Sequence, residues 1–264
     1  MKKILQIANI AALTITITLN YVAGAGLING QTIGDVSARY NNLFTPAGYA
    51  FSIWGLIYLM LAGFVIYQVR GLFKKVNNDN FILQIGWWFV ISCVANSLWL
   101  IAWVYDMIGF SVLLIVLLLF SLVKIIINTN MERWDAPFPK IVLLWWPFCL
   151  YSGWITVAII ANISTYLTKI GWNGFGISDV SWAITMIIIA GFINLFMIVT
   201  RNMREFALVG IWALVAVAVA NWQTHQSIVI TALVVSVVLF IAISIHGYQN
   251  RATAPHVKFK QMRK

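Results

Sequence analysis

Long apolar runs dominate the chain, and short segments between them hold most of its charged residues. Eight of these runs approach the ~20 residues that an α-helix needs to cross the hydrocarbon of a bilayer. They cover approximately residues 4–24, 46–69, 81–104, 108–128, 141–163, 180–199, 206–222 and 227–246. Membrane β-barrels instead alternate apolar and polar residues over segments of ~10 residues. The pattern predicts an all-α polytopic membrane helix bundle with eight transmembrane helices.

Composition supports the membrane assignment. Of the 264 residues, 62% are hydrophobic and only 9% are charged, and the mean hydropathy is +0.90. A soluble domain carries roughly 25% charged residues. We therefore expect a multi-pass protein of the cell membrane that is surrounded by lipid.

The net charge of +10 carries information about topology. If the N-terminus is cytoplasmic and the runs alternate in direction, all but two of the 17 Lys and Arg residues face the cytoplasm, the exceptions being Arg39 and Lys169. This agrees with the positive-inside rule, whereas seven spans would place the basic tail outside. We expect both termini in the cytoplasm and, because the basic residues are dispersed, no nucleic-acid partner.

The first run has some features of a signal peptide, namely a basic start and a small-residue sequence at 23–25. Its apolar region is longer than the usual 7–15 residues, and Gln6 and Asn9 interrupt its beginning. We therefore favour a retained helix over a cleaved leader.

Candidate catalytic chemistry is scarce. Within the apolar runs the sequence has no carboxylate pair, no Ser/His/Asp set and no metal-spaced His cluster. Cys93 and Cys149 lie inside apolar runs, where a free thiol behaves as a small hydrophobe. We expect a non-enzymatic protein without a cofactor or a metal site.

Aromatic residues are abundant, with 13 Trp, 9 Tyr and 16 Phe. Many suit the belts that Trp and Tyr form at membrane interfaces. A second group repeats at helical spacing on the second, third and fifth runs, and antiparallel packing would bring it to one depth in the outer half. The group comprises Trp54, Trp99, Trp103, Tyr151 and Trp154. Spacing alone leaves both core packing and a ligand pocket open.

Three motifs then stand in order along the chain: Pro46 and Tyr49 before Trp54 and Tyr58, Asn96-x-x-Trp99 with Trp103, and Pro147 before Tyr151 and Trp154. In these motifs the chain resembles the TspO/translocator protein family, the tryptophan-rich sensory proteins, over about residues 4–167. The resemblance implies a five-helix membrane bundle that binds porphyrins, sterols or synthetic aromatic ligands.

Carried over by motif, the resemblance implies a ligand site for a tetrapyrrole-like or sterol-like molecule. Its residues would be Pro46, Tyr49, Trp54, Tyr58, Asn96, Trp99, Trp103, Tyr151 and Trp154. The function implied is binding or sensing of an apolar aromatic molecule. Transport of a similar molecule is the alternative, and degradation of a bound porphyrin is a third possibility.

The chain also departs from the family pattern. The loop before Pro46 is shorter than usual, which predicts a reduced lid over the pocket. Ile155 replaces a small residue and would narrow the pocket, and Asn162 lies three residues later than the expected Asn.

The last three predicted helices have no counterpart in the five-helix pattern. We therefore expect a TspO-like bundle over 1–167, three additional transmembrane helices over 168–248 and a basic tail over 249–264. Asn194 and Asn221 are expected to form hydrogen bonds between helices. The added helices would either widen the bundle or form a homodimer surface.

Overall fold

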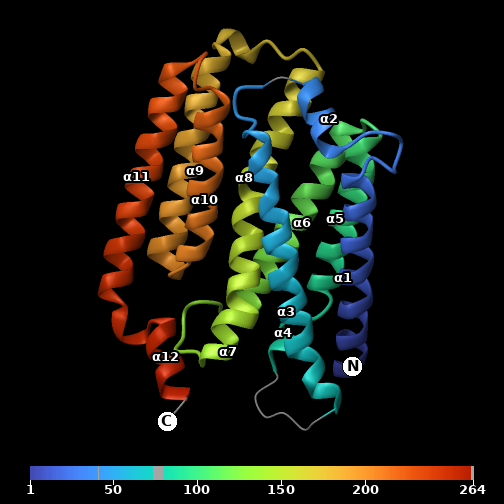
Figure 1. The fold of residues 1–264 in the computed structure, drawn as a ribbon, viewed down its shortest axis with the longest axis vertical. Coiled ribbons are helices and arrows are strands. Elements are labelled where there is room, and N and C mark those ends of the chain that lie inside the picture. The colour runs from blue at the N-terminus through green and yellow to red at the C-terminus, as the bar shows by residue number, and fades with distance from the viewer. Residues whose placement is uncertain (41, 74–79, 263–264) are drawn as a thin grey trace.

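A computed structural model describes residues 1–40, 42–73 and 80–262. These residues form helices and connections, with no strand among them. Eight helices of 17 or more residues occur in the described part of the chain. They run as rods along the long axis, and the N- and C-terminal ends lie at the same end of the molecule (Figure 1). We refer to this as the inner end and to the opposite one as the outer end.

The first five rods form one group. They are α1 (Lys2–Gly24), α3 (Ile53–Phe73), α5 (Trp88–Val104), α6 (Ile108–Asn128) and α8 (Trp146–Lys169). Within this group α1 packs on α3 and α5, α6 packs on α5 and α8, and α3 packs on α8. The short helix α2 (Ile33–Arg39) lies at the outer end (Figure 1).

Six helices are long and apolar enough to cross a membrane, the second including the turn before α3 and the fourth running over Phe138–Lys169. The other two rods contain α5 and α10 (Arg204–Ala220), which have 17 residues each. The third predicted span is divided, because Gly86 takes a positive φ of 56° between α4 (Phe81–Ile85) and α5. An L-residue with a side chain would be strained there.

The fifth rod is also irregular. It begins as α7 (Phe138–Lys140), widens into a π-helical turn (Ile141–Trp145) and continues as α8. Pro147 has no N–H to donate, and its ring crowds the carbonyl four residues earlier. The wider turn directly before it relieves this conflict, since helix irregularities of this kind accompany proline.

The polar residues of α1 face the bundle. The Gln6 side chain donates to the Gln68 carbonyl at 2.6 Å, and Asn9 donates to the Gln68 side chain at 2.9 Å. Thr16 bonds to the Cys93 carbonyl at 3.1 Å. The polar interruptions of the first run are therefore hydrogen-bonded contacts between helices.

The last three rods are α9 (Asp179–Arg201), α10 and α11 (Gln226–Gln249), followed by the short helices η4 (Arg251–Thr253) and α12 (Pro255–Met262). Helix α10 joins them to the first group, because it packs on α8 as well as on α9 and α11. An added Cβ on Gly153 of α8 would lie 2.8 Å from the Phe206 carbonyl oxygen of α10. Glycine thus permits a close helix contact at this position.

The two predicted interhelical asparagines differ. Asn221 donates to the Leu43 carbonyl at 3.0 Å and to the Val217 carbonyl of α10 at 2.9 Å, so it joins the end of α10 to the loop before Pro46 and not to another helix. Asn194 instead donates to Ala190 of its own helix, and its Oδ1 has no partner. The prediction for Asn194 was wrong, because its amide packs against Gly210, which leaves room for it but offers no side chain to bond.

Candidate functional site

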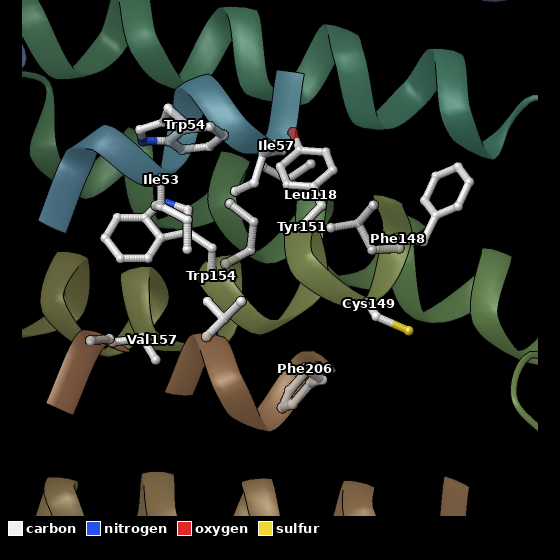
Figure 2. Close-up of a cluster of buried hydrophobic side chains, with 14 of the residues drawn as sticks. Ile53, Trp54, Ile57, Leu118, Phe148, Cys149, Tyr151, Trp154, Val157 and Phe206 are labelled. Carbon is white, nitrogen blue, oxygen red and sulfur yellow. The ribbon is translucent and has the colours of Figure 1, made fainter. Parts of the chain in front are cut away.

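An aromatic cluster occupies the outer half of the first helix group. Trp54 of α3 is at its centre, stacked on Tyr58 with ring centroids 5.4 Å apart and an interplanar angle of 18°. Its ring centroid also lies 6.5 Å from that of Trp99, 5.9 Å from Tyr151 and 6.3 Å from Trp154. Figure 2 shows Trp54 above the α8 side chains Tyr151 and Trp154. Residues from three separate helices therefore meet at one depth.

Hydrogen bonds fix the orientation of two of these rings. The Trp99 indole N–H donates to Asn162 Oδ1 at 2.8 Å, and the Trp103 N–H donates to the Ile33 carbonyl at 3.1 Å. The two rings stack on each other with centroids 5.7 Å apart. Asn162, which lies three residues late in the family pattern, thus positions Trp99.

Asn96 connects three helices. Its Nδ2 donates to the Tyr151 hydroxyl at 2.8 Å, and its Oδ1 accepts from Asn20 of α1 at 3.0 Å. The side chain is fully buried. These bonds are of the kind that holds membrane helices together.

A cavity of about 890 Å³ opens beside this cluster. Trp54, Tyr58 and Phe51 of the α3 segment line one side of it. Its other walls come from α1, α2, the loop before Pro46 and the turn between α10 and α11. The volume lies within the ~300–1,000 Å³ that small-molecule sites occupy.

A second cavity, of about 40 Å³, lies on the other side of Trp54 among the indole rings of Trp99, Trp103 and Trp154. Ile155 is part of its lining, as are Asn162 and Thr165. This space can hold about one water molecule but no planar aromatic ligand. The aromatic rings here pack against one another, and the open volume lies on the α1–α2–α10 side of Trp54.

The predicted site residues fall into three groups, according to which of the two cavities they line. Pro46, Trp54 and Tyr58 line the large cavity. Trp99, Trp103 and Trp154 line the small cavity, which Pro46 and Trp54 also border. The residues in neither lining are Tyr49, Asn96 and Tyr151.

Tyr49 faces away from the cluster. Its ring is 43% exposed and packs edge-on against Trp212 of α10, with centroids 5.2 Å apart. The Trp212 indole N–H donates to the Ala50 carbonyl at 3.1 Å. Tyr49 and Trp212 therefore form a contact between the start of α3 and α10 rather than a wall of the cavity.

Helix α2 covers the outer end of the large cavity with Ile33, Gly34, Ser37 and Ala38. A capping box, in which the Thr32 and Asp35 side chains each bond the other's backbone N–H, begins this helix. The short loop before Pro46 therefore contains a capped helix that lines the cavity, and the reduced lid relative to the family stays a prediction.

An ionic cluster holds this cover in place. The Tyr40 hydroxyl donates to Asp106 at 2.9 Å, and Lys169 Nζ lies 2.8 Å from Asp106 Oδ2. Arg39 of α2 lies 3.8 Å from the same carboxylate. Partial burial favours a higher pKa for Asp106, but the bonds from Lys169 and Tyr40 and the two positive charges outweigh it and lower that pKa.

Polar groups collect at the outer rim of the large cavity. They include Asn42, Asn221, Thr224 and His225. No Asp or Glu occurs among the described residues that line it. An amphipathic ligand would therefore meet aromatic surface at depth and neutral hydrogen-bonding groups at the rim.

Sequence reasoning missed two parts of this lining. Asn20 and Tyr21 come from α1, and Ala220 to His225 come from the end of α10 and the turn after it. The Ala47 N–H donates to the Ala216 carbonyl at 3.0 Å, which brings the α10 end against the loop before α3. Contacts between segments so far apart in the sequence leave no signal in local spacing.

The family comparison agrees with this architecture. The family of TSPO-like proteins matches residues 6–245 of the chain. The match extends beyond residue 167 through α9, α10 and most of α11, so the family pattern includes the last three rods. Among curated proteins and among solved structures, none matches the chain. On the match over nearly its whole length, the chain belongs to the TSPO-like protein family.

Proposed function

We propose that this protein binds, and thereby senses, a planar apolar aromatic molecule in the large cavity. The observation that carries the proposal is the stacked pair of Trp54 and Tyr58 along one side of a cavity of about 890 Å³. A flat ligand gains both buried apolar area and favourable ring geometry against such a surface. Family membership supports the same class of function.

A tetrapyrrole is the ligand class that the lining fits best. Its ring would lie on Trp54 and Tyr58, and its carboxylates would reach Asn221, Thr224 and His225 at the rim. No described lining residue carries a negative charge that would repel them. The Tyr58 hydroxyl is buried and makes no hydrogen bond of standard geometry, although Asn20 and Asn96 lie near it. A ring heteroatom could accept from this hydroxyl.

The proposed role is non-enzymatic. The described lining residues include one histidine, His225, and no Asp or Glu, and His225 lies at the rim rather than against the aromatic surface. Catalysis by proton transfer requires a group within hydrogen-bond reach of the reacting atom.

We further propose eight transmembrane segments with both termini in the cytoplasm of a cell. Eight rods are consistent with termini at one end of the molecule (Figure 1). The outer end carries α2 with Arg39 and the α8 end with Lys169, the two basic residues that the topology places outside. Cysteine accessibility at position 134 and at position 175, probed in intact cells and in lysates, would test this orientation.

Protoporphyrin titration of the protein in nanodiscs, followed by tryptophan quenching, tests the binding proposal. Saturable binding that weakens about tenfold in Trp54→Phe and less in Trp154→Leu would support it. Trp87→Phe, at an exposed indole near the inner end, is the matched control and should leave the affinity unchanged. Quenching that does not saturate, or that ignores Trp54→Phe, would contradict the proposal.

The same preparation separates the alternatives. Protein-dependent movement of protoporphyrin across sealed vesicles would indicate a transporter. Loss of the bound porphyrin spectrum with time, without release of unchanged porphyrin, would indicate an enzyme.

A further inference from the structure

A polar cluster lies on the inner side of the aromatic site, outside both of its cavities. Carboxylate oxygens of Glu132 and Glu205 and the sulfur of Cys149 all lie within 4.8 Å of one another. Glu132 belongs to the connection between α6 and α7, Cys149 to α8 and Glu205 to α10. The chain contains no other glutamate and one other cysteine.

One oxygen of each carboxylate is buried without a hydrogen-bond partner, although Arg204 lies near both groups and Trp146 lies near Glu205. Glu132 Oε1 and Glu205 Oε2 are shielded from solvent and have no hydrogen-bond partner. Neither glutamate forms a salt bridge with a basic side chain in residues 1–40, 42–73 or 80–262. Burial of a carboxyl oxygen without a partner is unfavourable, and it disfavours the charged form of the group. A ligand of positive charge would relieve this cost.

The nearest arginine does not fill that role. Arg204 lines the same cavity, but its side chain reaches α11, where its NH1 lies 3.3 Å from the position that a Cβ on Gly247 would take. Its Nε is also buried without a partner. Burial first, and the Glu205 charge second, raise the pKa of Glu132 to about 8 despite Arg204.

Open space lies beside the carboxylates. A cavity of about 240 Å³ is lined by Glu132 and Glu205 and also by His246 of α11. The His246 Nδ1 is buried and has no partner, while Nε2 lies 3.3 Å from the Asn250 amide. The cavity thus provides a route to the carboxylates, and His246 lines it without belonging to the cluster of Glu132, Cys149 and Glu205.

We propose that Glu132, Cys149 and Glu205 bind a divalent late first-row metal ion, with Zn²⁺ as the expected occupant. A thiolate combined with carboxylate oxygens is a donor set that Zn²⁺ accepts, whereas Mg²⁺ and Ca²⁺ prefer oxygen alone. Binding forms the metal–sulfur bond as the Cys149 thiol loses its proton to solvent. The alternative to a metal ion is a proton shared by the two glutamates. That arrangement would give no role to the Cys149 thiol.

The ion would have a structural role. Its ligands come from the α6–α7 connection, α8 and α10, so coordination would tie the last three rods to the first group at the inner end. One hydrogen bond already joins these segments, because the Asn202 side chain donates to the Glu132 carbonyl at 2.8 Å. Metal binding should therefore raise the thermal stability of the folded protein.

Co²⁺ provides the direct test, because a Co²⁺–thiolate bond gives a charge-transfer band in the near ultraviolet. We expect one Co²⁺ per chain, displaced by Zn²⁺, with the band absent in Cys149→Ala and present in Cys93→Ala. Glu132→Gln and Glu205→Gln should weaken Zn²⁺ binding by about tenfold or more. Asp135→Asn removes a carboxylate that lies on the same cavity but pairs with Lys258, and should have no effect.

Circular dichroism in chelator confirms that each variant folds before metal is added. The proposal is overturned by the absence of saturable binding in the folded wild type. It is equally overturned if binding persists unchanged in both glutamine variants, or if the charge-transfer band survives in Cys149→Ala.

Discussion

The outer and inner ends of this bundle differ in the kind of buried polar group that lacks a partner, which is neutral at the outer end, as in Tyr58 and Trp154, and includes carboxylate oxygens at the inner end. At the outer end the indole N–H groups of Trp99 and Trp103 and the amide of Asn96 all have partners. At the inner end one carboxylate oxygen each of Glu132 and Glu205 and the His246 Nδ1 have none. A satisfied network holds helices in one arrangement, whereas unsatisfied charge marks a place that a ligand completes. The outer polar groups therefore act as scaffold, and the inner ones as candidate ligands.

The largest loss of stability should come from disrupting the contact between α8 and α10. Gly153→Val places a side chain against the Phe206 backbone, where even a Cβ would lie 2.8 Å from the carbonyl oxygen. Overpacking against backbone should cost roughly 3 kcal/mol or more. Thermal denaturation in detergent measures this, with Gly55→Val as control, since nothing lies within 4 Å of a Cβ at Gly55. Equal effects at the two glycines would argue against the α8–α10 contact.

At the outer end, removing a satisfied hydroxyl should destabilise. Tyr151→Phe leaves the buried Asn96 amide without its acceptor, at a cost of about 1–3 kcal/mol. Tyr58→Phe removes a hydroxyl that has no hydrogen bond of standard geometry and should be nearly neutral. Chemical denaturation of the two variants in parallel tests the difference. A larger loss in Tyr58→Phe would contradict the scaffold assignment.

At the inner end, removing a carboxylate should raise the stability of the protein instead of lowering it. In chelator, Glu205→Gln relieves an unpaired buried carboxylate and should raise stability by about 1 kcal/mol. Saturating Zn²⁺ should reverse the order, because only the wild type gains the metal. The stability difference measured in chelator depends only on the burial of the carboxylate. It therefore tests the cost of that burial independently of whether a metal ion binds. A less stable variant in chelator would show that the carboxylate has a partner.

The smallest effect concerns the cover of the large cavity. Since the pKa of Asp106 is lowered in the folded protein, its contribution is present above the unfolded pKa of about 3.9 and is lost as pH falls through the lower folded value. Acidification below pH about 4 should release α2, and Asp106→Asn should do so at neutral pH. Hydrogen exchange over residues 33–39 measures both. Exchange that is unchanged in Asp106→Asn would show that the capping box alone holds the helix.

Much of the fold follows from the pattern of apolar runs, since each membrane helix needs a run of fixed length. The common depth of Trp54, Trp99 and Trp154 follows from antiparallel packing and the rise per residue. The sequence pattern does not predict on which side of Trp54 the large cavity lies, because that depends on contacts from α1 and α10. Likewise Glu132 lies in the α6–α7 connection and Glu205 lies 73 residues later in α10, so no spacing rule joins them with Cys149.

Helix α10 begins at the metal-site candidate and ends at the cavity rim. Glu205 is its second residue, and Asn221 directly follows its last, a separation of roughly 24 Å at 1.5 Å per residue. A packed helix transmits axial displacement along its length because its backbone hydrogen bonds resist compression. α10 would then move as a rigid unit: a shift of its inner end when an ion is bound would move the Asn221 side of the binding rim. Occupancy at either end would then be felt at the other, reciprocally and to the same extent.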